Sequence, residues 1–371
     1  MIVVAYILPV IACLLLHFEF DYEGPWTTYL WMIIFGEGTV GLLHWFFYDM
    51  HTSSTEYLGS MVKDINHEDA WTELVEVKET KTDNKGNSYT VTRIDERYHS
   101  EKYYLHTTRG SKIDTNFSFY CRVRDLWGLP ANTLRWTGSH IKGGVRYGSF
   151  YTIADFKEEE RENPNNWVPV TESNSYRNKV QASNSIFKFE KIDKKTASEI
   201  GLLDYPAIYS HDAPCVLSND ILIPPALDEL FRKFNARYAP EYQMRLYMLL
   251  YNADRGISIS EQQRSYWQGG NKNEFVICLG MNSKEEVEWA RAFSWADDQI
   301  KEVETAQWLM QHSNVNWFDF HAWLRWHLID WKRKEFKDFD YISITLPLWQ
   351  LLSIVFLTIA ENSFAIYWAV K

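Results

Sequence analysis

The sequence predicts a membrane-anchored α+β protein with three transmembrane helices, a β-rich subdomain and an α/β sandwich subdomain. Apolar runs are concentrated at the two ends of the 371-residue chain. Between them, residues 50–166 contain stretches in which apolar and polar side chains alternate with the period of a strand. In residues 167–314, apolar runs of strand length alternate with helical patterns, which is typical of a sheet covered by helices.

The last apolar run, residues 342–370, contains one ionisable side chain, Glu361. As a helix it would be ~43 Å long, which exceeds the ~30 Å hydrocarbon core of a bilayer. Trp349 lies near one end of the run and Trp368 near the other, where aromatic rings settle at the two membrane interfaces. The alternative is a helix buried in a water-soluble core. We expect residues 342–371 to form a C-terminal transmembrane helix.

Residues 1–49 are predicted to form a transmembrane helical hairpin. Residues 1–16 and 26–48 are apolar and flank a short acidic loop, and the first run is short enough to be a re-entrant or signal-anchor segment instead. Residues 36–41, GEGTVG, match the dinucleotide-binding pattern G-x-G-x-x-G, which requires a preceding strand and access to water. Inside a membrane helix, small residues instead let a neighbouring helix approach closely, so we expect a packing role for these glycines.

The charges that flank the apolar runs predict the orientation of the chain in a membrane. The loop 17–25 contains no Lys or Arg, whereas residues 331–337, WKRKEFK, contain several. The positive-inside rule then places residues 50–341 on the cytoplasmic side.

This orientation predicts a labelling pattern. A cysteine introduced at Gly24 should react with a membrane-impermeant thiol reagent added to intact cells, because the loop 17–25 is expected outside. A cysteine at Gly86 should not react until the cells are opened. The reverse pattern would place the region between the spans outside the cytoplasm.

Residues 50–166 are predicted to form the β-rich subdomain. Residues 73–78 and 88–94 alternate and flank residues 83–86, DNKG, whose turn chemistry is typical of a β-hairpin. Further strands are expected at residues 103–107, 117–123 and 145–153. The charged, Asn- and Pro-containing stretch 157–166 marks the expected end of this subdomain.

Residues 167–314 are predicted to form the α/β subdomain. Helical periodicity is present at residues 226–238, 258–267 and 297–311, and apolar runs of strand length at 243–252, 274–280 and 288–295. Residues 315–341 are aromatic and basic, which predicts an interfacial helix that leads into the last span.

Composition argues against a nucleic-acid partner, because the net charge of −11 would repel phosphates. The chain has 17 Trp, 22 Tyr and 21 Phe, an excess that suits membrane interfaces. Its four cysteines show no C-x-x-C spacing, so we expect reduced packing residues, without a disulfide framework or a zinc site.

Part of the α/β region resembles a TPM domain, a small α/β fold usually displayed beside a membrane. Residues 212–218, DAPCVLS, are similar to the opening motif of that family. The pattern of a helix, an apolar strand and a helix ending in Trp267 follows, and then the turn 269–273, GGNKN, before the apolar residues 275–279. This resemblance covers about residues 204–311. Because some relatives with this fold are described as phosphatases, it implies hydrolysis of a phosphate ester as one activity.

A second resemblance is broader and implies a source rather than an activity. Residues 55–59, TEYLG, 70–73, AWTE, 175–183, SYRNKVQAS, and 266–280 are similar to an uncharacterised family of membrane-anchored proteins of bacteria and tailed bacteriophages. The resemblance implies a bacterial or phage origin and a multi-pass protein of the bacterial inner membrane.

Glu37, His44 and Glu361 are the ionisable side chains inside the apolar runs. Such groups are costly in a membrane and usually face protein or water. Glu37 and His44 are two helical turns apart and therefore share a face. Protonated Glu37 and Glu361 would hydrogen-bond between helices and fix assembly, or the three residues would relay protons or ions. We favour the first interpretation, because three spans are too few for a transport path in a monomer.

A second set of candidate residues would line a loop cleft in the TPM-like region: Asp212, Trp267, Asn271, Asn273 and Glu274. Their carboxylate and amide oxygens suit Ca²⁺ or Mg²⁺, with Asp212 as the candidate metal ligand. The alternative is that these residues form turns and caps, and this is the interpretation we favour.

The sequence as a whole therefore predicts a membrane-held interaction or assembly module without catalysis or a cofactor. Its expected partners are the lipid bilayer and either further copies of the chain or other membrane proteins. The alternatives are a metal-dependent phosphatase-like enzyme and a proton- or ion-coupled oligomeric assembly.

Overall fold

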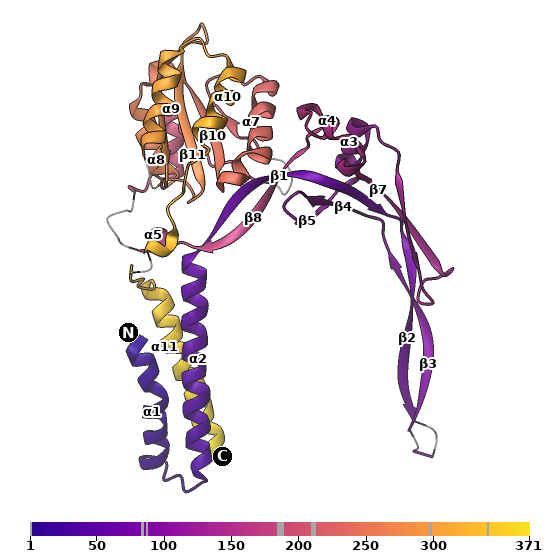
Figure 1. Ribbon diagram of the computed structural model, residues 1–371. Helices are drawn as coiled ribbons and strands as arrows, with labels where there is room; N and C mark the ends of the chain where they lie inside the picture. The colour runs from indigo at the N-terminus through magenta and orange to yellow at the C-terminus, as the bar shows by residue number, and fades with distance from the viewer. Residues whose placement is uncertain are drawn as a thin grey trace. The chain divides into compact units, whose positions relative to one another are not determined.

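The computed structural model describes residues 2–82, 85–86, 88–183, 189–208, 213–296, 299–339 and 341–371, and its ribbon is shown in Figure 1. The chain is a mixed α+β protein that divides into two compact units. The first unit comprises Met1–Thr55, Ser175–Glu190 and Lys334–Lys371, and the second Glu56–Asn174 and Lys191–Arg333.

The first unit is built around three helices that contact one another: α1 (Ile2–Phe18), α2 (Trp26–Thr52) and α11 (Leu348–Val370). By length and composition, α2 and α11 can each cross a membrane. Helix α1 has 17 residues and is shorter, so the third predicted span stays a prediction. The last helix begins at Leu348, six positions after the predicted start at residue 342.

The glycine pattern of residues 36–41 lies inside α2, with no strand before it, so it cannot form a dinucleotide-binding turn. A Cβ atom added to Gly36 would lie 2.6 Å from Cγ of Pro9. This contact is too short for any side chain, and Gly36 therefore allows α1 and α2 to approach closely, as the sequence predicts. The prediction does not hold for Gly38, where an added Cβ atom would have no neighbour within 4 Å.

The β-rich part of the second unit contains a six-stranded sheet and a separate two-stranded sheet. In the larger sheet the order is β5-β4-β1-β7-β6, and β8 also pairs with β1. Buried side chains such as Val62, Ile65 and Leu105 form its core with those of helix α3 (Phe117–Trp127). The strands are β1 (Ser53–Glu68), β4 (Lys102–Thr107), β5 (Lys112–Thr115), β6 (Asn132–Thr137), β7 (Val145–Thr152) and β8 (Pro169–Arg177).

The predicted hairpin is present as β2 (Trp71–Thr82) and β3 (Ser88–His99), which pair along their whole length. Asp83 and Asn84 of the predicted turn lie outside the described residues. The stretch 157–166 forms α4 (Glu158–Arg161) and a 3-10 turn, but β8 follows it and returns to β1, so the larger sheet continues beyond the expected end of the subdomain.

One predicted strand is wrong: residues 117–123 begin helix α3 (Phe117–Trp127). The Asn116 side chain caps this helix by accepting a hydrogen bond from the backbone N–H of Phe119 at 2.9 Å. Gly128 ends it in the left-handed conformation, with φ of 59°. Aromatic and β-branched residues favour strands locally, but burial of one helix face outweighs that preference here. The buried residues of this face are Phe119, Tyr120, Val123 and Trp127.

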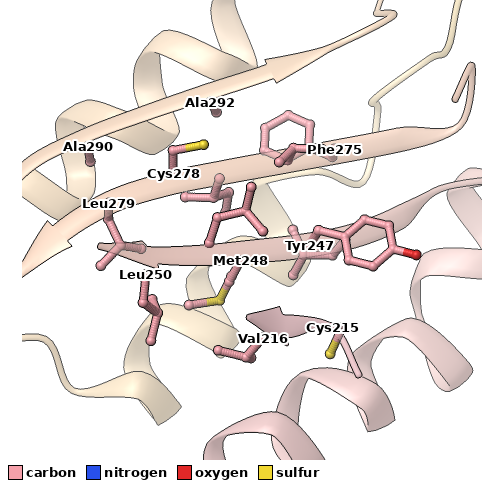
Figure 2. Packing of buried hydrophobic residues seen from close by; sticks show 14 of the residues in the cluster. Cys215, Val216, Tyr247, Met248, Leu250, Phe275, Cys278, Leu279, Ala290 and Ala292 are labelled. Atoms are coloured by element: carbon pink, nitrogen blue, oxygen red, sulfur yellow. The ribbon is translucent and has the colours of Figure 1, made fainter. Parts of the chain in front are cut away.

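The α/β part of the second unit has a four-stranded sheet in the order β12-β11-β10-β9. Strands β9, β10 and β11 are parallel, and β12 is antiparallel to β11. Figure 2 shows the apolar side chains packed on this sheet, and all residues of β11 are buried. The strands are β9 (Val216–Leu217), β10 (Arg245–Asn252), β11 (Glu274–Met281) and β12 (Val287–Ser294).

Helices lie on both sides of this sheet (Figure 1). The ring of Phe320 in α10 is 6.1 Å from that of Phe231 in α7 and 5.1 Å from that of Trp308 in α9, so these three helices pack together. The predicted strands and helices of this part are confirmed to within three residues. Its main helices are α7 (Pro225–Arg237), α8 (Ser258–Tyr266), α9 (Ile300–Gln311) and α10 (Trp317–His327), and α6 (Lys194–Ile200) is a short one. The short helix α5 (Lys179–Ala182) belongs to the first unit.

The aromatic and basic segment 315–341 contains α10 and a 3-10 turn, Phe336–Phe339. Phe320 and Leu324 of α10 are fully buried in the core of the α/β part. One face of this helix is therefore covered by protein, and its position at a membrane interface stays a prediction.

Candidate functional site

Helix α11 carries polar side chains on the face that it turns towards α1 and α2. Four of its residues, each four positions apart, are buried: Gln350, Ile354, Thr358 and Asn362. Residues at this spacing lie on one face of a helix. We use the name polar seam for Gln350, Thr358 and Asn362 of this face, together with Glu361 beside them and Thr39 of α2.

Two oxygen atoms of the polar seam are buried without a hydrogen-bond partner in the described part of the chain. Oε1 of Glu361 accepts a hydrogen bond from the Thr39 hydroxyl at 3.1 Å, but its Oε2 has no partner there. The other is Oε1 of Gln350, a residue that is 2% exposed. Thr358 and Asn362 instead donate to carbonyl oxygens of their own helix. The polar seam thus holds two acceptor atoms whose desolvation is uncompensated.

The three predicted intramembrane residues are only partly brought together. Glu361 bonds to Thr39 and not to Glu37, which lies two positions earlier on α2. Glu37 is partly exposed, and within the described residues its side chain has no hydrogen bond or ion pair. The ring of His44 lies 6.5 Å from that of Tyr48 on the same helix.

Sequence reasoning missed the neutral members of the polar seam, because it sought ionisable side chains. The last apolar run nevertheless carried a signal, because its polar residues Gln350, Thr358 and Asn362 are spaced by eight and four positions and so share one helix face. A helix that faced only lipid would have no reason to carry polar residues at this spacing. The missed residues are Thr39, Gln350, Thr358 and Asn362.

Three of the five residues predicted for a loop cleft meet before and at the start of β11. The Glu274 carboxylate accepts hydrogen bonds from the Asn271 backbone N–H at 2.9 Å and from the Asn271 amide at 3.0 Å. The Tyr205 hydroxyl also donates to this carboxylate, and the Tyr205 ring lies 5.0 Å from that of Trp267. Glu274 is 1% exposed, so this acid is enclosed by protein and does not face solvent.

The other two predicted cleft residues are not part of this group. The side-chain amide of Asn273 donates to the carbonyl oxygen of Tyr57 in β1 at 2.7 Å, and thereby ties the two parts of the second unit together. Its Oδ1 is buried and lacks a partner among the described residues. Asp212 lies outside the described residues.

Hydrogen bonds link Glu274 to a buried arginine through two tyrosines. Nε of Arg245 donates to the Tyr247 hydroxyl at 2.7 Å, and the hydroxyls of Tyr247 and Tyr205 are 3.5 Å apart. Nη1 of Arg245 donates to Thr171 of β8 at 3.3 Å. Arg245 is 1% exposed. We call Arg245, Tyr247, Tyr205 and Glu274 the buried Arg–Glu chain, since it connects a guanidinium and a carboxyl group inside the core.

Burial governs the protonation of this chain. It raises the pKa of the Glu274 carboxyl above its usual value, and hydrogen bonds from Tyr205 and Asn271 and the charge of Arg245 oppose that rise. Burial also raises the pKa of Tyr247 to about 12, and burial together with the nearby Glu274 raises the pKa of Tyr205. Both tyrosines therefore remain protonated donors at neutral pH.

The buried Arg–Glu chain is suited to holding structure. Gly270, with φ of +77°, precedes Asn271, and a Cβ atom on it would lie 2.8 Å from Oε2 of Glu274. The Glu274 carboxylate thus fixes the glycine turn. The cavity beside Arg245 has a volume of about 10 Å³, which is room for one water molecule and not for an organic substrate. Among the residues that the structure describes, no three His, Cys, Asp or Glu side chains are placed to hold a metal ion.

No family model, no curated protein and no solved structure matches this chain. The resemblances to a TPM domain and to a family of bacterial and phage membrane proteins therefore stay predictions.

Proposed function

We propose that this chain is a membrane-anchored assembly module that associates with further copies of itself and acts without catalysis. The observation that carries the proposal is Glu37 of α2, which is partly exposed and whose side chain has no hydrogen bond or ion pair within the described residues. The neighbouring polar seam supports it in another way, because the hydrogen bond from Thr39 to Glu361 holds α2 against α11 within one copy. A partly exposed acid on an apolar helix favours association, because a helix of a second copy can supply the missing hydrogen bond.

The setting of the module is part of the same proposal. Helices α2 and α11 meet the length and composition of membrane spans, which supports anchoring in a membrane. The basic residues before α11 favour a cytoplasmic position for the region between the two helices. The resemblances in sequence favour the inner membrane of a bacterium and a bacterial or phage complex.

One alternative is favoured by a specific observation. Glu361 lies against α2 with one carboxylate oxygen on Thr39, where a proton could be exchanged during ion or proton movement through an oligomer. The phosphatase-like alternative has less support, because Glu274 is enclosed and bonded to Tyr205 and Asn271. A Ca²⁺ or Mg²⁺ ion would need Asp212 and ligands other than Glu274.

Substitutions of Glu37 test the proposed association. Glu37→Gln should preserve self-association of the full chain in lipid nanodiscs, because glutamine keeps the size and the hydrogen-bonding capacity. Glu37→Leu should weaken it by about 1 kcal/mol, or roughly fivefold, because the hydrogen bond is lost. The measurement is the dissociation constant from dilution of two differently labelled copies.

The control is Leu42→Met, at a position of α2 that is 68% exposed, and it should leave association unchanged. A chain that stays monomeric at every concentration would refute self-association. If both Glu37 variants associate normally but Glu37→Gln abolishes proton flux in liposomes, the ion-coupled alternative replaces the proposed function.

A further inference from the structure

The hairpin of β2 and β3 is a two-stranded sheet with 12 residue pairs. Isolated two-stranded sheets are marginally stable in water, and most sheets gain stability from a third strand or a covering helix. Ile94 and Tyr98 point to the same face of β3 and are 63% and 70% exposed. The hairpin therefore exposes apolar surface, and it has fewer strands than a sheet needs to be stable on its own.

The two outer edges of this hairpin differ. Near its base, the edge of β2 is occupied: the backbone N–H of Leu74 donates to His140 at 2.7 Å, and that of Lys142 donates to Thr72 at 2.9 Å. Along β3, the structure pairs no strand with the outer edge among the described residues. An edge of this length displays a row of unpaired backbone donors and acceptors.

We propose that β3 pairs antiparallel with β3 of a second copy of the chain, which joins the two hairpins into one four-stranded sheet. This inference rests on the self-association proposed above and names a surface for it. The two-fold axis stands perpendicular to the sheet and passes beside Ile94, so that Ile94 lies opposite its own copy.

Charge complementarity selects this register. With Ile94 on the axis, Arg93 lies opposite Asp95 of the second copy, and Asp95 lies opposite the second copy's Arg93. Arg93 and Asp95 already form an ion pair within one strand, at 3.1 Å, so the four side chains would form one alternating cluster. Moving the axis by one position places Arg93 or Asp95 opposite its own copy, and like charges directly opposite are destabilising.

The remaining pairs in this register are also compatible. Thr92 faces Glu96 of the second copy, and Val91 faces Arg97, so no like charges meet. The two copies of Ile94 become direct cross-strand neighbours, which removes the most exposed aliphatic side chain of the hairpin from water. Tyr98 lies opposite Thr90 on the same face.

A register-specific disulfide tests the pairing in the full chain reconstituted in lipid. The chain carries Cys121→Ser to prevent other disulfides, because Cys121 is the cysteine that is not buried. Ile94→Cys should give a disulfide-linked dimer under mild oxidation, since directly opposite residues lie within reach of a disulfide. Thr92→Cys is the matched control on the same strand and face. Its own copy would be four positions away, ~13 Å, and it should form at least about tenfold less dimer. Equal yields from the two variants would overturn the register.

A charge exchange tests the same pairing without a covalent bond. Arg93→Asp alone and Asp95→Arg alone should each weaken homodimers by about tenfold, because like charges then face each other across the axis. A mixture of the two variants should associate as well as the wild type, since every opposite pair is restored in the mixed dimer.

Two outcomes distinguish failure of the hairpin pairing from failure of the proposed function. If the chain self-associates but neither the cysteine pair nor the charge exchange discriminates, the hairpin pairing is wrong and the proposed function stands. If the wild-type chain is monomeric in lipid, both fall.

Discussion

Val276→Asp is expected to abolish folding of the α/β part of the second unit. Val276 and its neighbour Phe275 point to opposite faces of β11, and each is 0% exposed. Figure 2 shows the apolar side chains that surround Phe275 and Cys278 on this strand and its neighbours. An unpaired carboxylate on either face loses its hydration and gains no partner, so we expect each substitution to cost at least about 4 kcal/mol.

The measurement is the fraction of full chain recovered as a monodisperse species in detergent, together with protease resistance of the α/β part. Phe275→Asp should fail in the same way as Val276→Asp, because both faces of the strand are covered. The control is Glu288→Asp at the exposed position of β12, which should behave as the wild type. Normal folding with Asp at both positions would contradict a strand buried on two faces.

Arg245→Ala has the second largest expected effect, a loss of about 3–5 kcal/mol in the free energy of unfolding. The substitution removes a guanidinium that is 1% exposed and leaves the Tyr247 hydroxyl and the Glu274 carboxylate without the charge that opposes their burial. Arg245→Met should recover part of the packing but not the electrostatic loss. A cost below about 1 kcal/mol would show that the buried Arg–Glu chain contributes little.

The pH dependence of this loss follows from the sign of the Glu274 shift. Its pKa is raised in the folded state, so the folded state binds the proton more tightly and stability falls as the pH rises from about 4.5 through the raised value. Without Arg245 the charged carboxylate is less well compensated. The destabilisation by Arg245→Ala should therefore be larger at pH 8 than at pH 5, and Glu274→Gln should remove most of this difference. A loss of stability that is independent of pH would show that Arg245 does not act through the charge of Glu274.

The sequence predicted the α/β part well because each of its elements carries its own signal. The strand β11 is a short apolar run that follows two glycines, and the helix α7 follows two prolines. Such local signals need no knowledge of distant partners. By contrast, β1 and β8 were not predicted, because they are polar enough to resemble loops and are stabilised by pairing with each other across about a hundred residues.

Helix α3 is an element whose local sequence predicted the wrong structure. Residues 117–123 are rich in aromatic residues, which favour strands, and only the cap at Asn116 and the helical spacing of Phe119, Tyr120, Val123 and Trp127 reveal the helix. The candidate site was also predictable in part. Glu361 and Glu37 were found by their charge, whereas the hydrogen bond between Glu361 and Thr39 depends on how two distant helices pack.

That hydrogen bond also has a consequence for the synthesis of the protein. Thr39 and Glu361 are separated by 322 positions. At a translation rate of ~5–20 residues per second, synthesis of α11 would follow that of α2 after roughly 15–65 seconds. During that time the face of α2 around Thr39 would lie in the bilayer without α11, its final neighbour there. Nascent chains of this protein would therefore pass through a stage that is open to premature association, or to protection by an insertion factor.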